Sequence, residues 1–219
     1  MMGVNERPSV TEGDEKLVPL ENHGIKLMSM GFLLQDDQPV IWRGPMIMRT
    51  IQQFISQVLW GELDYLLVDL PPGTGDAQIS LCQTVPLDGG VIVTTPQEAS
   101  LGVVRKGIEM FRKVDVPVLG IIENMALHRC SQCGHVEHIF GEGGGERVAA
   151  EYGVRLLGSL PLAASVREET DAGRPTVASD PASAAGEAFV AAARALRAVV
   201  EADAGGDAGA APTISITDD

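Results

Sequence analysis

Short, almost uninterrupted apolar runs recur along this chain, and each is followed by a stretch whose apolar residues have helical spacing. The runs cover residues 25–30, 63–70, 90–95, 116–122 and 154–160. Runs such as LDYLLVDL and GVIVTT are apolar on both faces, as is typical of central strands covered by helices on each side. The helical stretches are expected at residues 45–60, 77–84, 98–114, 144–152 and 181–201. This alternation predicts right-handed β-α-β units, and therefore one α/β domain with a doubly wound, mainly parallel sheet.

Acidic residues are concentrated at the two ends of the chain. The 219 residues carry 16 basic and 30 acidic side chains, a net charge of −14. We therefore expect an acidic, flexible N-terminal segment (1–22), a folded domain (23–202) and a disordered acidic tail (203–219). A nucleic-acid partner is not expected, because affinity for the phosphate backbone comes largely from Lys and Arg.

The chain has none of the sequence signals of a membrane or secreted protein. No window approaches the roughly 18 uninterrupted apolar residues of a transmembrane helix, and the N-terminus is not basic and then apolar. Three cysteines, Cys82, Cys130 and Cys133, are too few for a disulfide scaffold. We expect a cytoplasmic protein without a membrane partner, in which a close cysteine pair is more often a metal or redox site.

The segment LDYLLVDLPPGTGD (63–76) places a carboxylate at the end of a predicted strand. Ligands of open α/β sheets bind beyond the carboxyl ends of the strands, which is where Asp69 is expected. A carboxylate in this position holds phosphate-bound Mg²⁺ in P-loop enzymes, and Gly73 would let backbone N–H groups approach a phosphate. The alternative is that Asp69 caps the turn. Asp76 is expected to cap the following helix and is included in the site.

Seven motifs occur in one order and at one spacing along residues 22–180. They are PVIWRGPM (39–46), WGELDYLLVDLPPGTGD (60–76), VTTPQ (93–97), GIIENM (120–125), CSQCG (130–134), IFGEGGG (139–145) and GSLPL (158–162). Together they resemble the Mrp family of iron–sulfur cluster carriers, which are MinD-like P-loop ATPases with a deviant Walker A loop. The resemblance implies that Asp69 is the Mg²⁺ and switch carboxylate, and that the cluster passes to apo iron–sulfur proteins under the control of ATP.

The chain departs from this family in one motif. A P-loop requires a Gly-Lys step, and no Gly-Lys occurs in the sequence. The chain therefore resembles a family member that begins after the P-loop strand and helix, and we predict that it is inactive as an ATPase by itself. The glycine-rich stretch at 141–145 lacks a following Lys and is expected to form a helix-entry turn.

The resemblance also assigns the adenine side of the site. Asn124 follows a predicted strand and offers both a donor and an acceptor, as an adenine edge requires. In MinD-like ATPases a similarly placed Asn contacts the base, and backbone near Pro161 would line the other side. The alternative is that Asn124 caps the loop that leaves the strand.

Cys130 and Cys133 form a C-x₂-C pair, which supplies half of a four-coordinate metal site. Two chains could combine their pairs around one cluster, or His135 or His138 could complete a zinc site within one chain. A redox dithiol is a third possibility. Cys82 is expected to pack as a small apolar residue.

The resemblance favours a 4Fe–4S cluster bridging a homodimer. Two alternative functions follow from the other readings of the residues. One is a non-catalytic, zinc-binding dimerisation module, and the other is a MinD-like regulatory ATPase without a cluster.

Overall fold

The central layer of the protein is a four-stranded sheet built around one long strand. The computed structural model describes residues 1–13, 15–33, 44–70, 73 and 75–204. The long strand β4 (Val118–Arg129) pairs in parallel with β3 (Gly90–Thr94) and with β6 (Leu156–Pro161). Its far end pairs antiparallel with the short strand β5 (Val136–Glu137). The sheet is mainly parallel, as predicted.

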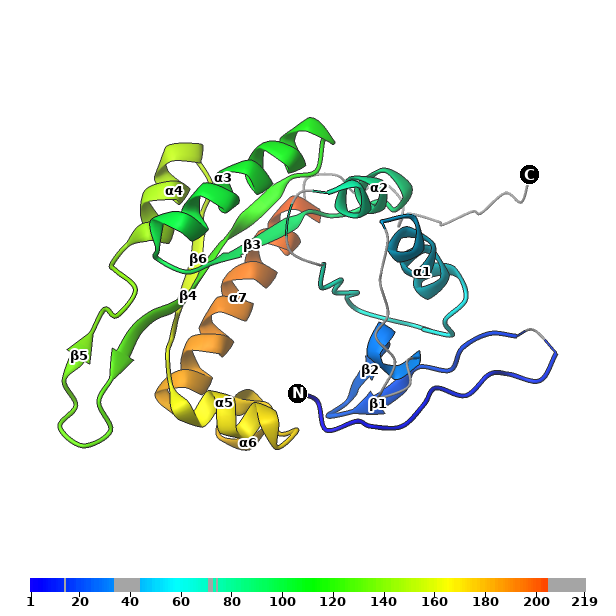
Figure 1. The fold of residues 1–219 in the computed structure, drawn as a ribbon, viewed down its shortest axis with the longest axis horizontal. Coiled ribbons are helices and arrows are strands. Elements are labelled where there is room, and N and C mark those ends of the chain that lie inside the picture. The colour runs from blue at the N-terminus through cyan, green and yellow to red at the C-terminus, as the bar shows by residue number, and fades with distance from the viewer. Residues whose placement is uncertain (14, 34–43, 71–72, 74, 205–219) are drawn as a thin grey trace.

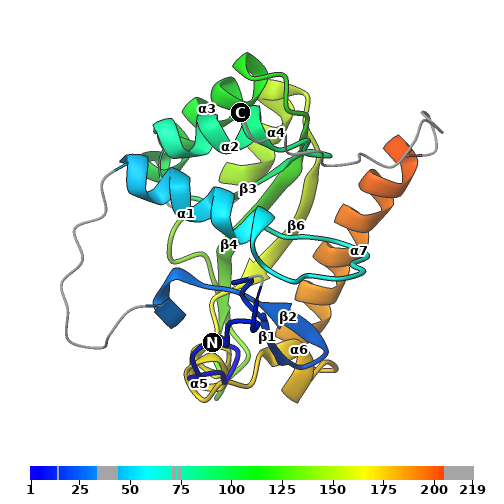
Figure 2. The ribbon, with the colours of Figure 1, turned by 90° about the vertical axis from the view of Figure 1, so that its right-hand side faces the viewer.

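Helices cover both faces of this sheet (Figures 1 and 2). On one face, α3 (Glu98–Lys113) and α4 (Gly144–Tyr152) enclose the larger core, in which Leu101, Ile108 and Ile121 are fully buried. On the other face, α7 (Ala184–Ala204) packs Val199 against the strands. The doubly wound architecture is therefore confirmed. Two short helices, α5 (Ala164–Asp171) and α6 (Thr176–Ser179), connect β6 to α7 and were not predicted.

A bulge in β4 changes which of its side chains point to each face of the sheet. The register with β3 shifts so that Val91 lies opposite Gly120 and Gly90 opposite Val118. Leu119 and Ile121 are two residues apart, yet they belong to the cores on opposite faces. A Cβ on Gly120 would lie 2.6 Å from Cγ of Leu157, so only glycine permits this approach.

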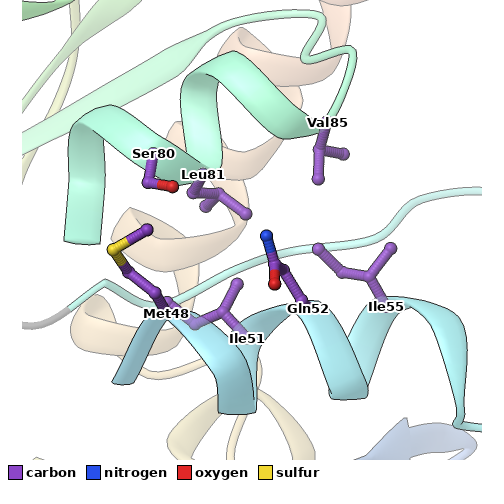
Figure 3. A pocket seen from close by; sticks show the side chains of 7 residues that line it. All are labelled: Met48, Ile51, Gln52, Ile55, Ser80, Leu81 and Val85. Atoms are coloured by element: carbon purple, nitrogen blue, oxygen red, sulfur yellow. The ribbon is translucent and has the colours of Figure 1, made fainter. Parts of the chain in front are cut away.

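The helices α1 (Gly44–Ser56) and α2 (Asp76–Thr84) pack against each other beside the main body, close to their predicted positions. Figure 3 shows their side chains meeting across the seam, which is lined by Met48, Ile51, Gln52, Ile55, Ser80, Leu81 and Val85. The remaining space is about 10 Å³, which is about the volume needed for one water molecule. This seam is packing rather than a ligand site.

The prediction of a central strand at residues 63–70 is wrong. The segment has no regular structure, and its apolar side chains before Leu70 are exposed, with Leu67 84% and Tyr65 53% accessible. An extended apolar run becomes a strand only where a neighbouring strand offers hydrogen bonds. Among the described residues β3 pairs only with β4, and no strand pairs with residues 63–70.

The run at residues 25–30 also differs from the prediction of a parallel strand. Residues Ile25–Leu27 form β2, which pairs antiparallel with β1 (Leu20–Asn22) in a separate hairpin. The turn residues His23 and Gly24 have φ values of 51° and 72°, as a two-residue turn between twisted strands requires. A 3₁₀ turn, η1 (Met30–Leu33), follows. The domain boundary expected after residue 22 falls within this hairpin, and most of the expected tail (205–219) lies outside the described residues.

No helix in the described part of the chain is long and apolar enough to cross a membrane.

The exposed segment generates a prediction about local stability. Amide hydrogens of residues 62–69 make no backbone hydrogen bond within the described chain, whereas those of Ile121–Glu123 lie in the centre of the sheet. We expect residues 62–69 to exchange with solvent about a thousandfold faster than the centre of β4, or more. Hydrogen–deuterium exchange with peptide-level mass spectrometry measures this difference. Equal protection of both segments would show that residues 63–70 pair as a strand in solution.

Candidate functional site

The cysteine pair lies in the connection of a hairpin that extends β4 beyond the body of the sheet (Figure 1). The pairs His128–Glu137 and Arg129–Val136 close the hairpin. At its tip, the Cys130 N–H donates to the His135 carbonyl at 2.8 Å, and the Gly134 N–H donates to the Cys130 carbonyl at 2.9 Å. These bonds fold the C-x₂-C sequence into a compact knuckle.

The knuckle stabilises a thiolate at its first cysteine. The pKa of the Cys130 thiol is lowered, because backbone N–H groups of Cys133 and Gln132 and the Cys133 thiol donate hydrogen bonds to its sulfur, and His128 adds positive charge nearby. Cys130 is half-buried and Cys133 is exposed, and neither is in a disulfide. Both thiols are therefore free in the described structure, and that of Cys133 is accessible from outside.

One chain does not complete a metal site in the described structure. No group of three or more His, Cys, Asp or Glu side chains in the described residues is arranged to hold a metal ion. In the described residues neither His135 nor His138 is arranged beside the cysteine pair as a third zinc ligand.

The neighbouring histidines are engaged in the hairpin itself. His138 Nδ1 lies 2.9 Å from the Ala126 carbonyl and His128 Nδ1 lies 3.0 Å from the Leu162 carbonyl. Both contacts tie the hairpin to the end of the sheet. The redox alternative requires a dithiol that opens a helix, but the next helix, α4, begins only at Gly144.

Cys82 has a different environment from the pair. It lies on α2 and packs against the larger core, and burial raises the pKa of its thiol. The expectation that Cys82 packs as an apolar residue is confirmed.

The adenine-side residues lie on adjacent strands at the carboxyl edge of the sheet. The register pairs Glu123 with Ser159 and Leu127 with Pro161, so Asn124 and Pro161 belong to neighbouring parallel strands. The Asn124 Oδ1 accepts the N–H of Met125 at 3.0 Å, while Met125 has a φ of 56°. This hydrogen bond lies inside β4, which continues to Arg129, so no loop leaves the strand at Asn124 as the capping alternative expected. Among the described residues the amide nitrogen of Asn124 makes no hydrogen bond.

A buried carboxylate beside Asn124 was missed by the sequence reasoning. Glu123 is only 4% exposed, and its Oε1 accepts the Gly145 N–H at 2.6 Å, at the N-terminus of α4. A negative charge is favourable there because of the helix dipole. The sequence signal was an acidic residue directly after the apolar run at 116–122.

The glycine-rich stretch is a helix-entry turn, as predicted. Gly143 adopts the left-handed conformation with φ of 64°, and α4 begins at Gly144. A Cβ on Gly144 would lie 2.5 Å from the Pro96 carbonyl oxygen, so this glycine allows α4 to approach the end of β3.

The residues predicted for the phosphate side are arranged differently from the expectation. Asp69 is exposed in the irregular segment 63–70, because no strand forms there, and so it does not lie at the carboxyl end of a sheet strand. Gly73 is exposed with φ of 108°, and Asp76 is the first residue of α2. Helix α2 packs mainly on α1, so the structure does not join these residues to Asn124 and Pro161.

Comparison with known proteins identifies relatives of this chain. A model of the ParA family, described as NUBPL iron-transfer P-loop NTPase, matches residues 1–197. The iron-sulfur cluster carrier protein of Pseudomonas fragi is 55% identical over 184 residues, which are 83% of this chain and 63% of the relative. The protein of the same name from Escherichia coli K12 is 50% identical, over 84% of this chain and 50% of the relative. The iron-sulfur cluster transfer protein NUBPL of Mus musculus is 46% identical, over 87% and 59%. The chain thus spans between half and two-thirds of these relatives.

Solved structures support the same fold. A nucleotide-binding protein from Archaeoglobus fulgidus in complex with ADP has a TM-score of 0.64 and 39% identity, over 77% of this chain and 65% of that chain. The cell division ATPase MinD of Pyrococcus furiosus has a TM-score of 0.53 and 22% identity, over 72% and 59%. The second likeness, at 22% identity, concerns the fold alone.

The opposite pKa shifts of two cysteines generate a prediction. The pKa is lowered for Cys130 and raised for Cys82, so Cys130 becomes a thiolate, and reacts, at lower pH. With iodoacetamide and the metal-free chain, we expect the pH midpoint of alkylation to lie below that of an ordinary thiol for Cys130 and above it for Cys82. Peptide mapping by mass spectrometry across a pH series measures both midpoints. Coincident midpoints would contradict the hydrogen-bonded knuckle.

Proposed function

The chain belongs to the ParA family of NUBPL-type iron-transfer P-loop NTPases, and on this premise we propose that it binds an iron–sulfur cluster and passes it to apo iron–sulfur proteins. The observation that carries the proposal is the exposed Cys130–Cys133 knuckle, with backbone N–H groups directed at the first sulfur. Such hydrogen bonds stabilise the negative charge of thiolates that serve as cluster ligands. Relatives named as iron–sulfur cluster carrier and transfer proteins support the same function.

The number of ligands supports a cluster shared by two chains. A 4Fe–4S cluster is held by about four cysteine thiolates, and the described part of one chain offers one pair. A two-fold axis through the hairpin tips would bring two identical pairs together around one cluster. We therefore propose a homodimer in which Cys130 and Cys133 of both copies are the ligands.

The exposure of the pair suits a carrier rather than a permanent electron-transfer centre. Cys133 is exposed and the hairpin has only two β4–β5 residue pairs, so incoming thiolates of a recipient can reach the cluster. In each exchange a recipient thiol would lose its proton and replace one carrier thiolate, which would take up a proton as it leaves, so the charge of the cluster would not change. A reducing compartment, such as the cytoplasm, keeps both partners as thiols.

Part of a nucleotide site is also included in the proposal. Asn124 retains an amide donor, and its oxygen has a second lone pair, which fits an adenine edge, with Pro161 on the neighbouring strand. ATP and Mg²⁺ would in addition require a phosphate cradle. Asp69, Gly73 and Asp76 are the candidates in this chain, but they do not fit that role as arranged here, since they lie apart from Asn124 on an irregular segment and on α2.

Reconstitution with iron and sulfide tests the cluster. Anaerobic incubation of the chain should give a brown protein with about two iron atoms per chain, because each copy would hold half of a four-iron cluster. Cys130→Ser and Cys133→Ser should each abolish the visible absorbance that arises from sulfur-to-iron charge transfer in the cluster. Each should also abolish the dimer that light scattering detects. Iron analysis, visible spectra and molar mass provide the measurements.

Cys82→Ser is the matched control, because the Cys82 thiol packs against the core and away from the pair. This substitution should leave iron content and molar mass unchanged. A colourless protein that retains one tightly bound zinc ion per chain would contradict the cluster. That result would favour a zinc-binding interaction module instead.

A further prediction concerns ATP. Phosphoryl transfer needs the triphosphate and Mg²⁺ to be held, and most of that holding in P-loop enzymes comes from the glycine-loop amides and its lysine. The 219 residues contain no Gly-Lys step, so we expect no detectable ATP hydrolysis by this polypeptide alone. A phosphate-release assay measures this. ATP hydrolysis by the original chain that is lost in Asp69→Ala would contradict this prediction. It would show that the chain forms a phosphate site without a P-loop.

A further inference from the structure

A groove lies beside α3. Helix α3 covers the face of the sheet opposite to α7 (Figure 2). Its volume is about 460 Å³. Residues of α3 form most of it, with Ile79 of α2 and Tyr152 of α4 completing the walls. None of the residues assigned above to the cluster or the nucleotide lines this groove.

The groove combines an apolar floor with a basic rim. The floor is made by Ile79, Met110, Val114 and Tyr152. Arg105, Lys106 and Lys113 stand around it, with one acidic residue, Glu109. Both lysines are exposed, and they are two of only four in the chain. A concentration of basic residues is unusual on a protein whose net charge is −14.

The arginines and acids at this surface are already paired, and the lysines are not. Arg105 binds Glu151 at 3.0 Å. Arg112 binds Glu109 at 3.2 Å and lies 5.1 Å above the ring of Tyr152. Within the described part of the chain, Lys106 and Lys113 form no ion pair. The uncompensated positive charge of the groove is therefore that of the two lysines.

The spacing of the lysines indicates an elongated ligand. They are seven residues apart on α3, or about 10 Å along the helix axis, which is more than one phosphate or carboxylate group can bridge. The apolar floor lies between and beside them. A ligand that fits must carry negative charges two helical turns apart and an apolar surface between them.

We propose that this groove binds an acidic, amphipathic helical segment of a partner protein. Such a segment places carboxylates one heptad apart beside Lys106 and Lys113 and buries its apolar side chains on Met110, Val114 and Tyr152. The groove lies beside the C-terminal half of α3, whose end precedes the start of β4, whereas the cysteine hairpin continues the other end of β4 (Figure 1). A partner bound here leaves the cysteine pair accessible, and this binding does not depend on the proposed cluster.

A designed peptide tests the groove on the full 219-residue chain. The probe is a fluorescein-labelled helical peptide of fourteen residues with Glu one heptad apart and Leu on the same face between them. We expect anisotropy to show saturable binding that weakens as salt rises from 50 to 300 mM, because the lysine contacts are exposed. The double variant Lys106→Glu/Lys113→Glu should bind at least tenfold more weakly.

The double variant Arg174→Glu/Arg194→Glu is the matched control, since it changes the net charge equally at exposed positions outside the groove. It should bind the peptide within twofold of the original chain. Circular dichroism melts check that both variants remain folded. An equal loss of binding in both variants would overturn the proposal, because attraction would then depend on net charge alone.

Three other results would also overturn the proposal. Undiminished binding of a peptide with Ser in place of Leu would show that the apolar floor is not used. Equally strong competition by inorganic tripolyphosphate would make the groove a general anion site. Binding that requires deletion of residues 205–219 would assign the groove to the acidic end of this chain, or of a second copy.

Discussion

The hydrogen bonding of β4 to two parallel neighbours is the interaction on which the rest of the structure depends. β4 is the only described strand that pairs on both sides, and it holds β3 and β6 in one sheet. Its two faces carry the two cores, one beneath α3 and α4 and the other beneath α7. Loss of β4 would remove the middle of the surface that both helix layers cover, because α3 and α4 bury apolar side chains against one face of this sheet and α7 against the other.

The pattern of apolar residues correctly predicted those helices and strands whose neighbours in the fold lie within the described chain. The apolar runs at 90–95, 116–122 and 154–160 became β3, β4 and β6, and all five expected helices formed near their expected positions. The run at 63–70 has the same composition but became irregular, because apolar character reports a tendency to be buried and not the presence of a strand to pair with. Likewise, residues 25–27 joined the nearest available partner, a strand two residues away across the His23–Gly24 turn.

The candidate site was predictable where its chemistry is local in sequence. The spacing of Cys130 and Cys133 predicted a metal-binding pair, and the knuckle hydrogen bonds lie within that same short segment. The contact between Glu123 and Gly145 was not predictable, because it joins residues 22 positions apart through the approach of α4 to the sheet. For the same reason, the motifs of the sequence assigned Asp69 and Asn124 to the same family. They could not predict whether the folded chain brings these two residues together.

The continuity of β4 from the core to the cysteine knuckle has a mechanical consequence. A force applied at the knuckle along the strand loads the parallel β3–β4 and β4–β6 ladders in shear, so many hydrogen bonds resist it at once. A force that separates β5 from β4 acts instead on the two residue pairs of the hairpin and on the contact of His138 with the Ala126 carbonyl, which open one after the other. The cysteine-bearing tip is therefore compliant when peeled sideways and stiff when pulled lengthwise, so a docking molecule can bend the knuckle without disturbing the core.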